Sequence, residues 1–368
     1  MSEKAQPLQT TVNIVLSRPF GSMFSALLSL QEDLLSFTYD DKENNEVDEI
    51  SITLKDEKGK WASYWKPEGG EKVNAIIYTG SIYTPIKKKL DCGTFYVDSL
   101  RVSGSPRTME IKAVSVPLNK PIRRKIKTRA WEKVTLKDIA QKIAEEAGLT
   151  PILKFTDNPT YDRHEQKRES DLKFLSRLCE EIGLSLKIAQ DSLIVFDQGY
   201  YEKLPAIKTF TLGKSDILSW DFETSQSEVY KSVEVQYRDP KKNKKVWGDG
   251  YNFDLERVYE SKEKNVYSYV LTDPTVSEDG QEYGVKTRAK SLNDAKRIAK
   301  ANLRRLNLRR LTGSMTIIGD VSLHAGDVIK CVGFGSFDGN FVISTASHNV
   351  SSSGYTTTLS LRRANTEY

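Results

Sequence analysis

The side chains that could do chemistry are few in this sequence and lie far apart. It holds three histidines, His164, His324 and His348. Glu165 follows His164 as in a zinc-protease motif, but that motif needs a second histidine four residues after the first, where this chain has Arg168. His324 falls at a predicted turn and His348 on an alternating strand, and their spacing brings them to no carboxylate. We therefore expect no metal site, and we interpret His164 as a loop histidine ahead of a helix.

The cysteines and one glycine-rich stretch also favour structural roles. Cys92, Cys179 and Cys331 are widely spaced and no CxxC occurs, which is typical of unpaired thiols in a reducing compartment. Cys179 occupies an apolar helix position, so we expect it in the core. The stretch GFGSFDG (333–339) resembles a phosphate loop, but a strand follows it where such a site needs a helix, so we expect a hairpin turn. With no Walker A loop and no G-x-S-x-G elbow, we expect no catalytic or cofactor-binding residue.

Two neighbouring helices carry clear boundary signals. Thr135 and Asp138 have the spacing of a capping box at the start of the first. The second begins after Ser170, a good N-cap, and ends at Gly183. Their ends are related, IAEEAGL and LCEEIGL, and a strand hairpin follows the second. Residues 129–204 are therefore predicted to form a small α+β module of two helix–strand units.

Strand patterns fill most of the remaining chain. Short segments rich in Val, Ile, Tyr and Phe alternate apolar and polar residues in 1–128, and the pattern resumes in 205–368. The secondary structure of residues 20–37 stays open, because the stretch MFSALLSLQEDLL also fits a helix. Several short strands at this spacing indicate a barrel or a sandwich. We predict a β-rich α+β fold, with a first β domain at 1–128, the α+β module at 129–204 and a second β domain at 205–368.

A third helix is predicted at 291–308, inside the second β domain, with Ser291 and Asp294 as a capping box. Its row of basic side chains could neutralise nucleic-acid phosphates. The same row also suits a helix that solvates the face opposite its apolar stripe, and no aromatic residue stands among it to stack on bases. The net charge of only +5 favours the second interpretation. The basic row of this helix is Lys296, Arg297, Lys300, Arg304, Arg305, Arg309 and Arg310.

A separate basic hairpin tip is predicted at 239–250.

Composition and the start of the chain bear on its location. The apolar share of 38% and the charged share of 29% are those of a globular protein. The first residues, MSEKAQPLQTT, lack the apolar core of a signal peptide. No apolar run approaches the roughly 20 residues that span a bilayer. We expect the chain to be made in the cytoplasm and to stay soluble.

Three segments, taken in order, resemble the phage late control D protein family, the baseplate hub proteins of contractile tails. They are GTFYVDSLRVSGSPRTMEIKAVSVPL (93–118), RHEQKRESDLKFLSRLCEEIGLSLKI (163–188) and the stretch 324–363, which ends in a H…GYTT.L.LRR pattern. The resemblance covers most of the chain. The residues that carry it are Phe95, Asp98, Gly104, Pro106, Gln166, Ser170, Asp171, Phe174, Leu175, Gly183, Gly339, His348, Gly354 and Tyr355.

This resemblance implies a structural protein rather than an enzyme, with no cofactor. Such hubs form a homotrimer in which each subunit contributes two similar β-barrel domains. Three subunits then make a pseudo-sixfold ring that joins the tail tube to the central spike. The implied partners are the tail tube protein, a separate central spike protein, and the tape measure and baseplate wedge proteins, with no membrane. The chain would be made in the bacterial cytoplasm and assembled into the baseplate of a phage, a tail-like bacteriocin or another contractile injection system.

Two functions of other classes stay open beside the hub. One is a cell-wall hydrolase of a tail tip, although no lytic motif is present. The other is a nucleic-acid-binding module that uses the basic helix at 291–310.

Overall fold

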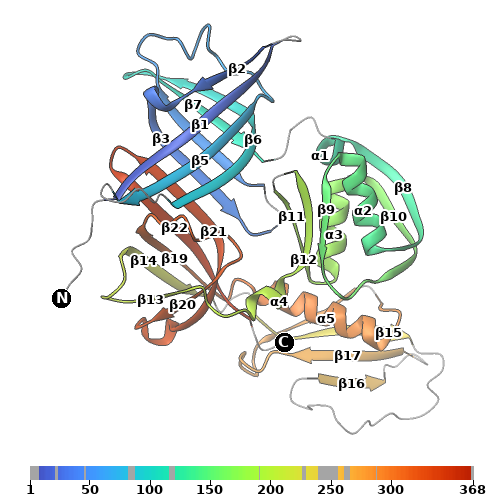
Figure 1. The fold of residues 1–368 in the computed structure, drawn as a ribbon. Coiled ribbons are helices and arrows are strands. Elements are labelled where there is room, and N and C mark those ends of the chain that lie inside the picture. The colour runs from blue at the N-terminus through green and yellow to red at the C-terminus, as the bar shows by residue number, and fades with distance from the viewer. Residues whose placement is uncertain are drawn as a thin grey trace.

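The computed structural model describes residues 8–20, 24–44, 47–81, 88–115, 121–189, 191–225, 229–238, 256–260, 266–286 and 288–365. Strands dominate, and helices gather beside them in one region (Figure 1). The prediction of a mostly β fold with an α+β part is confirmed. The hairpin tip predicted at 239–250 lies outside the described residues. None of the described helices is long and apolar enough to cross a membrane.

Among the described residues, one sheet of thirteen strands runs through both predicted β regions. Its order is β14-β19-β22-β21-β3-β4-β7-β6-β5-β1-β2, while β20 pairs with β21 and β13 pairs with β20. No pairing among the described strands closes either half into a barrel. The first half has β1 (Leu8–Phe20), β2 (Phe24–Ser29), β3 (Leu34–Lys42), β4 (Glu49–Lys55), β5 (Lys72–Ser81), β6 (Lys88–Ser103) and β7 (Thr108–Val114); the second has β13 (Lys208–Thr211), β14 (Ile217–Thr224), β19 (Leu311–Ile318), β20 (Val328–Val332), β21 (Gly339–Ser351) and β22 (Gly354–Arg363).

The two halves meet where β3 pairs antiparallel with β21, with Tyr39 opposite His348. Burial alternates with period two along β3 and β4, as a sheet with one face on the core requires. The helix considered within 20–37 is wrong, because this part forms β2, a single 3-10 turn (Gln31–Asp33) and the start of β3. Pairing of β3 on both of its edges, with β4 and with β21, outweighs the local helix pattern.

In the part of the chain that the structure describes, the module beside the sheet has two small sheets and three helices (Figure 1). The capping box of Thr135 and Asp138 is confirmed, and so is Ser170 as the N-cap that accepts from the amide of Lys173. His164, predicted in a loop, lies on a strand opposite Trp131, because 160–170 pairs along almost its whole length with 126–135. The elements are α1 (Pro121–Arg124), β8 (Ile126–Thr135), α2 (Leu136–Ala147), β9 (Thr150–Lys154), β10 (Thr160–Ser170), α3 (Asp171–Glu181), β11 (Leu184–Ala189) and β12 (Ser192–Asp197).

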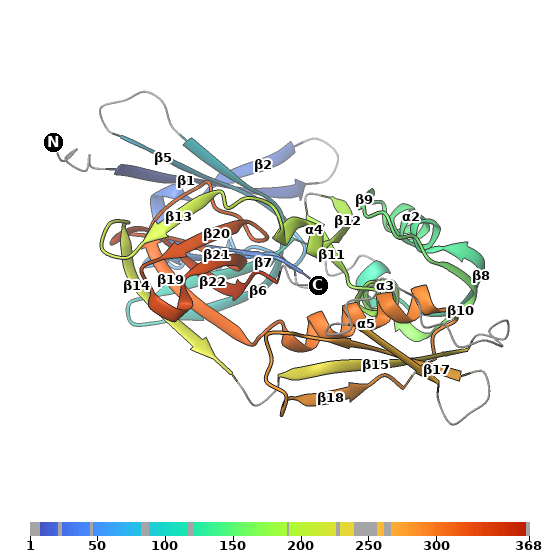
Figure 2. The same cartoon turned by 90° about the horizontal axis from the view of Figure 1, so that it is seen from below.

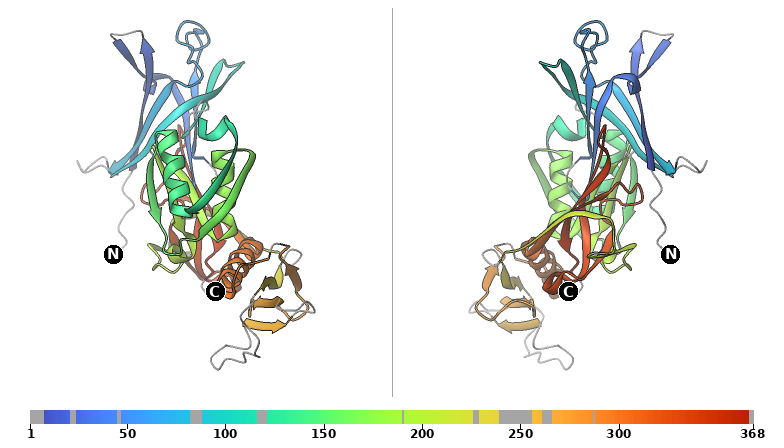
Figure 3. Two further views of the ribbon diagram at one scale, coloured as in Figure 1. Left: turned by 90° about the vertical axis from the view of Figure 1, so that its right-hand side faces the viewer. Right: turned by 90° about the vertical axis from the view of Figure 1, so that its left-hand side faces the viewer.

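A four-stranded sheet with one helix projects from the lower end of the molecule (Figures 2 and 3). The predicted third helix is confirmed as α5 (Leu292–Asn307) with Ser291 as its N-cap. The capping box is only half formed, because the Asp294 carboxylate accepts from the amide of Lys290. This part has its own core, in which Val233 and Tyr269 pack against α5. Its strands are β15 (Tyr230–Arg238), β16 (Glu256–Glu260), β17 (Val266–Thr272) and β18 (Gln281–Gly284), and α4 (Gln198–Glu202) leads from the module back to the large sheet.

Candidate functional site

The residues of the first and third resembling segments meet at the join of the large sheet. The His348 ring on β21 stacks on Tyr39 of β3, with centroids 5.9 Å apart. Phe95 of β6 packs edge-on against the same Tyr39, also at 5.9 Å. Tyr39 was not among the predicted residues, yet it connects two that were. These rings hold the two halves of the sheet together.

His348 is fully buried, and both of its ring nitrogens make hydrogen bonds. Its Nε2 lies 3.2 Å from the carbonyl oxygen of Leu323, which can only accept, so Nε2 carries the proton. Its Nδ1, 2.7 Å from the Tyr355 hydroxyl, is then the acceptor. Burial lowers the pKa of His348 to about 4, so the ring is neutral near pH 7. This predicted motif histidine is thus an uncharged ring that is hydrogen-bonded inside the core.

A second set of motif residues forms a buried polar cluster where α3 leaves β10. Asp171 is almost fully buried and accepts from Arg129 Nη2 at 2.9 Å and from Lys127 Nζ at 2.5 Å. Gln166 donates to the same carboxylate at 2.9 Å and accepts from Arg129 Nε at 3.0 Å. Glu146 of α2 also pairs with both cations. The cluster therefore fixes α3 and α2 against β8 and β10.

The apolar motif residues lie directly beside this cluster. Phe174 and Leu175 are fully buried in the core of the module. Phe174 stacks on Trp131 with centroids 6.1 Å apart, and the Arg129 guanidinium lies 4.2 Å from the centre of the Trp131 ring. A cation over an aromatic face adds to the binding of that cation. The predicted scaffold role of the second segment agrees with these contacts.

The remaining motif residues shape turns and close approaches. Asp98 is exposed, at an irregularity of the β6–β7 pairing, and Gly104 and Pro106 lie in the exposed turn between those strands. Gly183 has φ +77°, and a β-carbon there would lie 3.2 Å from the Cβ of Ala301 on α5. Glycine thus lets the end of α3 approach α5 closely. Gly339, with φ +132°, starts β21, and Gly354 lies in the β21–β22 hairpin.

The prediction missed a buried ion-pair network that ties the large sheet to α4 and α5. Arg362 of β22 donates to Glu43 at 3.0 Å and 2.5 Å, and to Glu202 of α4 at 2.6 Å. Glu202 also pairs with Arg304 of α5. All four side chains are at most 7% exposed. Arg362 stands in the quoted LRR pattern, but nothing local in the sequence indicates partners this distant.

A second network joins β3 to the module. Lys187 of β11 lies 2.5 Å from Asp41 and 3.3 Å from Asp48, and Asp41 also accepts from the amide of Ala325 at 2.9 Å. Burial raises the pKa of Asp48 to about 6, and the neighbouring Asp41 adds to this against the attraction of Lys187. These contacts fix the module against the first half of the sheet near its join with the second.

His164 and Cys179, which were considered for metal binding and catalysis, both pack against neighbouring side chains of the module. His164 is half-buried between Tyr161 and Phe174, with Arg177 Nη1 3.4 Å from its Nε2. Cys179 is buried, which raises the pKa of its thiol to about 12, so it is not a thiolate at neutral pH. Among the described residues, no group of three His, Cys, Asp or Glu side chains is placed to hold a metal ion.

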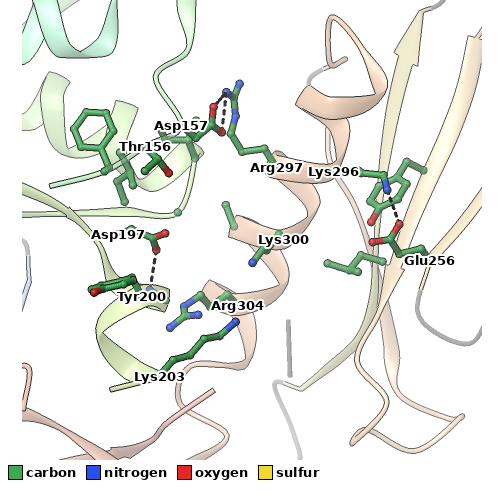
Figure 4. A pocket seen from close by; sticks show the side chains of 18 of the residues that line it. Thr156, Asp157, Asp197, Tyr200, Lys203, Glu256, Lys296, Arg297, Lys300 and Arg304 are labelled. Carbon is green, nitrogen blue, oxygen red and sulfur yellow. Dashed lines mark hydrogen bonds and ion pairs between the residues drawn. The ribbon is translucent and has the colours of Figure 1, made fainter. Parts of the chain in front are cut away.

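Most of the basic row on α5 is engaged within the chain. Arg304 is buried against Glu202, and Lys296 pairs with Glu256 at 2.7 Å. Arg297 pairs with Asp157 and Asp294. Three members of the row, Arg304, Arg297 and Lys296, therefore already have carboxylate partners and do not form a free phosphate-binding face. A pocket of about 630 Å³ lies beside this helix (Figure 4).

Both the sequence and the fold are similar to those of phage tail proteins. The model of the family described as phage tail baseplate hub (GPD) matches residues 97–354. A probable baseplate hub protein of Escherichia phage P2 is 28% identical over 224 residues, which is 58% of this chain and 54% of that protein. The chain thus spans about half the length of the P2 relative it matches. A probable baseplate hub protein of Escherichia phage 186 is 23% identical over 364 residues, covering 90% and 89% of the two chains.

Solved structures share the fold. A tail protein from Neisseria meningitidis superposes with a TM-score of 0.65 over 96% of each chain, at 14% identity. A component of the E. coli type VI secretion system, described as similar to the T4 tail proteins gp27 and gp5, has a TM-score of 0.55 at 14% identity and covers 98% of this chain and 78% of its own. The family model matches more than half of the residues, including His348 and the polar cluster around Asp171. The chain belongs to the phage tail baseplate hub family.

Proposed function

We propose that this chain is the structural hub of a contractile-tail baseplate, a homotrimeric ring that joins the tail tube to the central spike. The observation that carries the proposal is the construction of the large sheet. Its two halves pack separate cores, one around Phe37 and Phe95 and one around Phe210 and Phe341, and join side by side at β3 and β21. Three copies would present six such halves, which suits a hexameric tube on one side and a threefold spike on the other.

The domain division belongs to the same proposal. Residues 1–128 and 205–368 each form a barrel-like β domain, and residues 129–204 form the module between them. The helix α5 and the strands β15 to β18 are an elaboration of the second domain. The buried networks of Glu43, Arg362 and Glu202 and of Asp41, Lys187 and Asp48 support this, because they fix the parts relative to one another. A ring subunit needs such rigidity to present repeated interfaces at fixed angles.

The likeness to hubs of phages P2 and 186 supports a role in the baseplate without catalysis. The likeness to a type VI secretion component that resembles the T4 tail proteins gp27 and gp5 supports a place in an injection machine. We infer that the spike of this machine is a separate protein. The tube, tape measure and baseplate wedge proteins would be the other neighbours, with synthesis in the bacterial cytoplasm. The engaged cations of α5 speak against the nucleic-acid alternative. The surroundings of His164 and Cys179 speak against the hydrolase alternative.

The native mass of the purified chain tests the proposal. It should be measured by light scattering over a range of concentrations, first alone and then with the spike and tube proteins of the same particle. A species at three times 41.7 kDa, alone or on addition of the spike, is the expected result. A chain that stays monomeric in all mixtures would overturn the trimeric hub. Cleavage of cell wall in a zymogram, or DNA binding that weakens steeply with salt, would favour the alternatives instead.

A further inference from the structure

The pocket beside α5 lies between parts of the molecule that belong to different cores. One wall is α5, another is α4, and the others come from the module and from β16 and β17. Its volume of about 630 Å³ falls within the range of roughly 300–1,000 Å³ that is typical of ligand pockets. Apolar side chains line much of it, among them Phe155, Leu184 and Leu271. Tyr200 stands on the α4 wall with 63% of its surface exposed (Figure 4).

Positive charge exceeds negative charge on the walls. The cations are Lys203, Lys296, Arg297, Lys300 and Arg304, and the acids are Asp157, Asp197 and Glu256. Glu256 is engaged by Lys296, Asp157 is engaged by Arg297, and Asp197 caps α4 through the amide of Gly199 at 2.9 Å. The ammonium groups of Lys203 and Lys300 make no hydrogen bond or ion pair with any residue that the structure describes.

These two lysines converge with Arg304 at the end of the pocket next to α4 (Figure 4). Arg304 is 5% exposed, and its Nε and Nη1 find no hydrogen-bond partner among the described residues. Its Glu202 partner is already shared with Arg362. Desolvation, with repulsion from Lys203 and Arg304, lowers the pKa of Lys300. An anion placed here would relieve this repulsion.

We propose that the pocket binds an acidic, partly apolar polypeptide segment of a neighbouring protein, with one carboxylate held by Lys203 and Lys300. The buried Arg304 adds a third positive charge beneath the surface of the pocket wall. The apolar walls and the exposed Tyr200 ring receive the side chains that flank the carboxylate. An exposed tyrosine beside an apolar depression is typical of protein–protein contacts, in which tyrosine is enriched.

The same lining argues against a densely charged ligand. Asp157, Asp197 and Glu256 would repel the repeated phosphates of a nucleic acid, whereas a single carboxylate can approach the two free lysines. The source of the segment, another protein of the same particle, rests on the proposed hub function. The existence of the pocket does not depend on the hub function, because a monomeric chain would present the same walls.

A peptide selection tests this inference on the full-length chain. A displayed library of random 12-residue peptides is selected on the wild type and counter-selected on the variant K203E/K300E. The leading peptide is then synthesised with its acidic residues intact and with each Glu or Asp replaced by its amide. Enriched sequences are expected to place Asp or Glu beside aromatic or aliphatic residues. The amide form, and the variant K203E/K300E, should each bind about tenfold more weakly or worse.

Matched variants separate the pocket from general charge effects. K214E/K330E makes the same change at two exposed lysines outside the pocket, and K203R/K300R keeps the charge; both should bind within about threefold of the wild type. Enriched peptides without acidic residues, or equal binding by wild type and K203E/K300E, would overturn the inference. Native mass is measured for each variant, so loss of the trimer, which concerns the hub, is distinguished from loss of peptide binding.

Discussion

The Nδ1 atom of His348 accepts a hydrogen bond of 2.7 Å from the Tyr355 hydroxyl, across the hairpin of β21 and β22. Through Tyr39, the same imidazole contacts the first half of the sheet. Protonation would turn Nδ1 into a donor that faces the hydroxyl, and would place a charge in a fully buried site. The join of the two halves is therefore sensitive to acid.

We expect the free energy of unfolding to fall between pH 6.5 and pH 4. The folded pKa of His348 is about 4 and the ordinary value is 6.5, so the unfolded chain takes up this proton first. The contribution of the neutral ring is complete above pH 6.5 and is lost as the pH falls towards 4. Its size is at most about 3.5 kcal/mol, at about 1.4 kcal/mol per pH unit. Urea unfolding of the wild type and of His348→Asn at several pH values checks this, with a shallower acid slope expected in the variant.

His324 provides a control, because its effect on the pH dependence of stability is opposite to that of His348. The nearby Asp327 carboxylate, 3.6 Å from Nδ1 of His324, raises the pKa of His324, so its contribution is present in acid and is lost as the pH rises past the folded value. His324→Gln should therefore steepen the loss of stability in acid. Equal slopes for the wild type and His348→Asn would show that the buried imidazole does not govern the acid response.

Asp171→Ala should destabilise the chain much more than Asp98→Ala, although both aspartates are motif residues. Removing the Asp171 carboxylate leaves Arg129, Lys127 and Gln166 without their shared acceptor, at a cost of about 2–4 kcal/mol. Asp98 is exposed, so its replacement should change stability by about 0.5 kcal/mol or less. Urea unfolding of the two variants makes the comparison. Similar losses in both would contradict a special role for the buried cluster.

Local signals made the helices predictable from the sequence. The Thr135 capping box and the Ser170 cap involve residues only three positions apart, so their spacing is visible in the chain. The His164 strand was missed because its pairing with 126–135 places charged side chains on a long two-stranded ribbon, which lacks a clean alternation. Arg304 was taken for a surface cation because its partner Glu202 lies on another element. Arg362 and Glu43 are separated by 319 residues, and only the fold brings them together.

Glu202→Gln should loosen α5 from the rest of the molecule. The variant keeps the shape of the side chain but leaves the buried Arg304 and Arg362 guanidinium groups without their shared charge. Amide hydrogen exchange is expected to speed up in α5 and near Asn365, whose amide donates to Glu202 at 2.8 Å. Glu57→Gln is the matched control, because the pair of Glu57 and Lys55 is exposed and contributes little. Unchanged exchange in α5 would show that the network does not hold the helix.

Leu175→Asp should abolish soluble protein, while His164→Ala should leave the native mass unchanged. Leu175 is fully buried in the module core, where a carboxylate would have no partner. His164 is only half-buried, and its alanine variant removes ring contacts with Tyr161 and Phe174 without leaving a buried charge. We expect it to lose about 1 kcal/mol. Soluble yield, light scattering and metal analysis of the two variants provide the measurement. A soluble, folded Leu175→Asp chain, or a bound metal that disappears in His164→Ala, would show that this segment does more than support the fold.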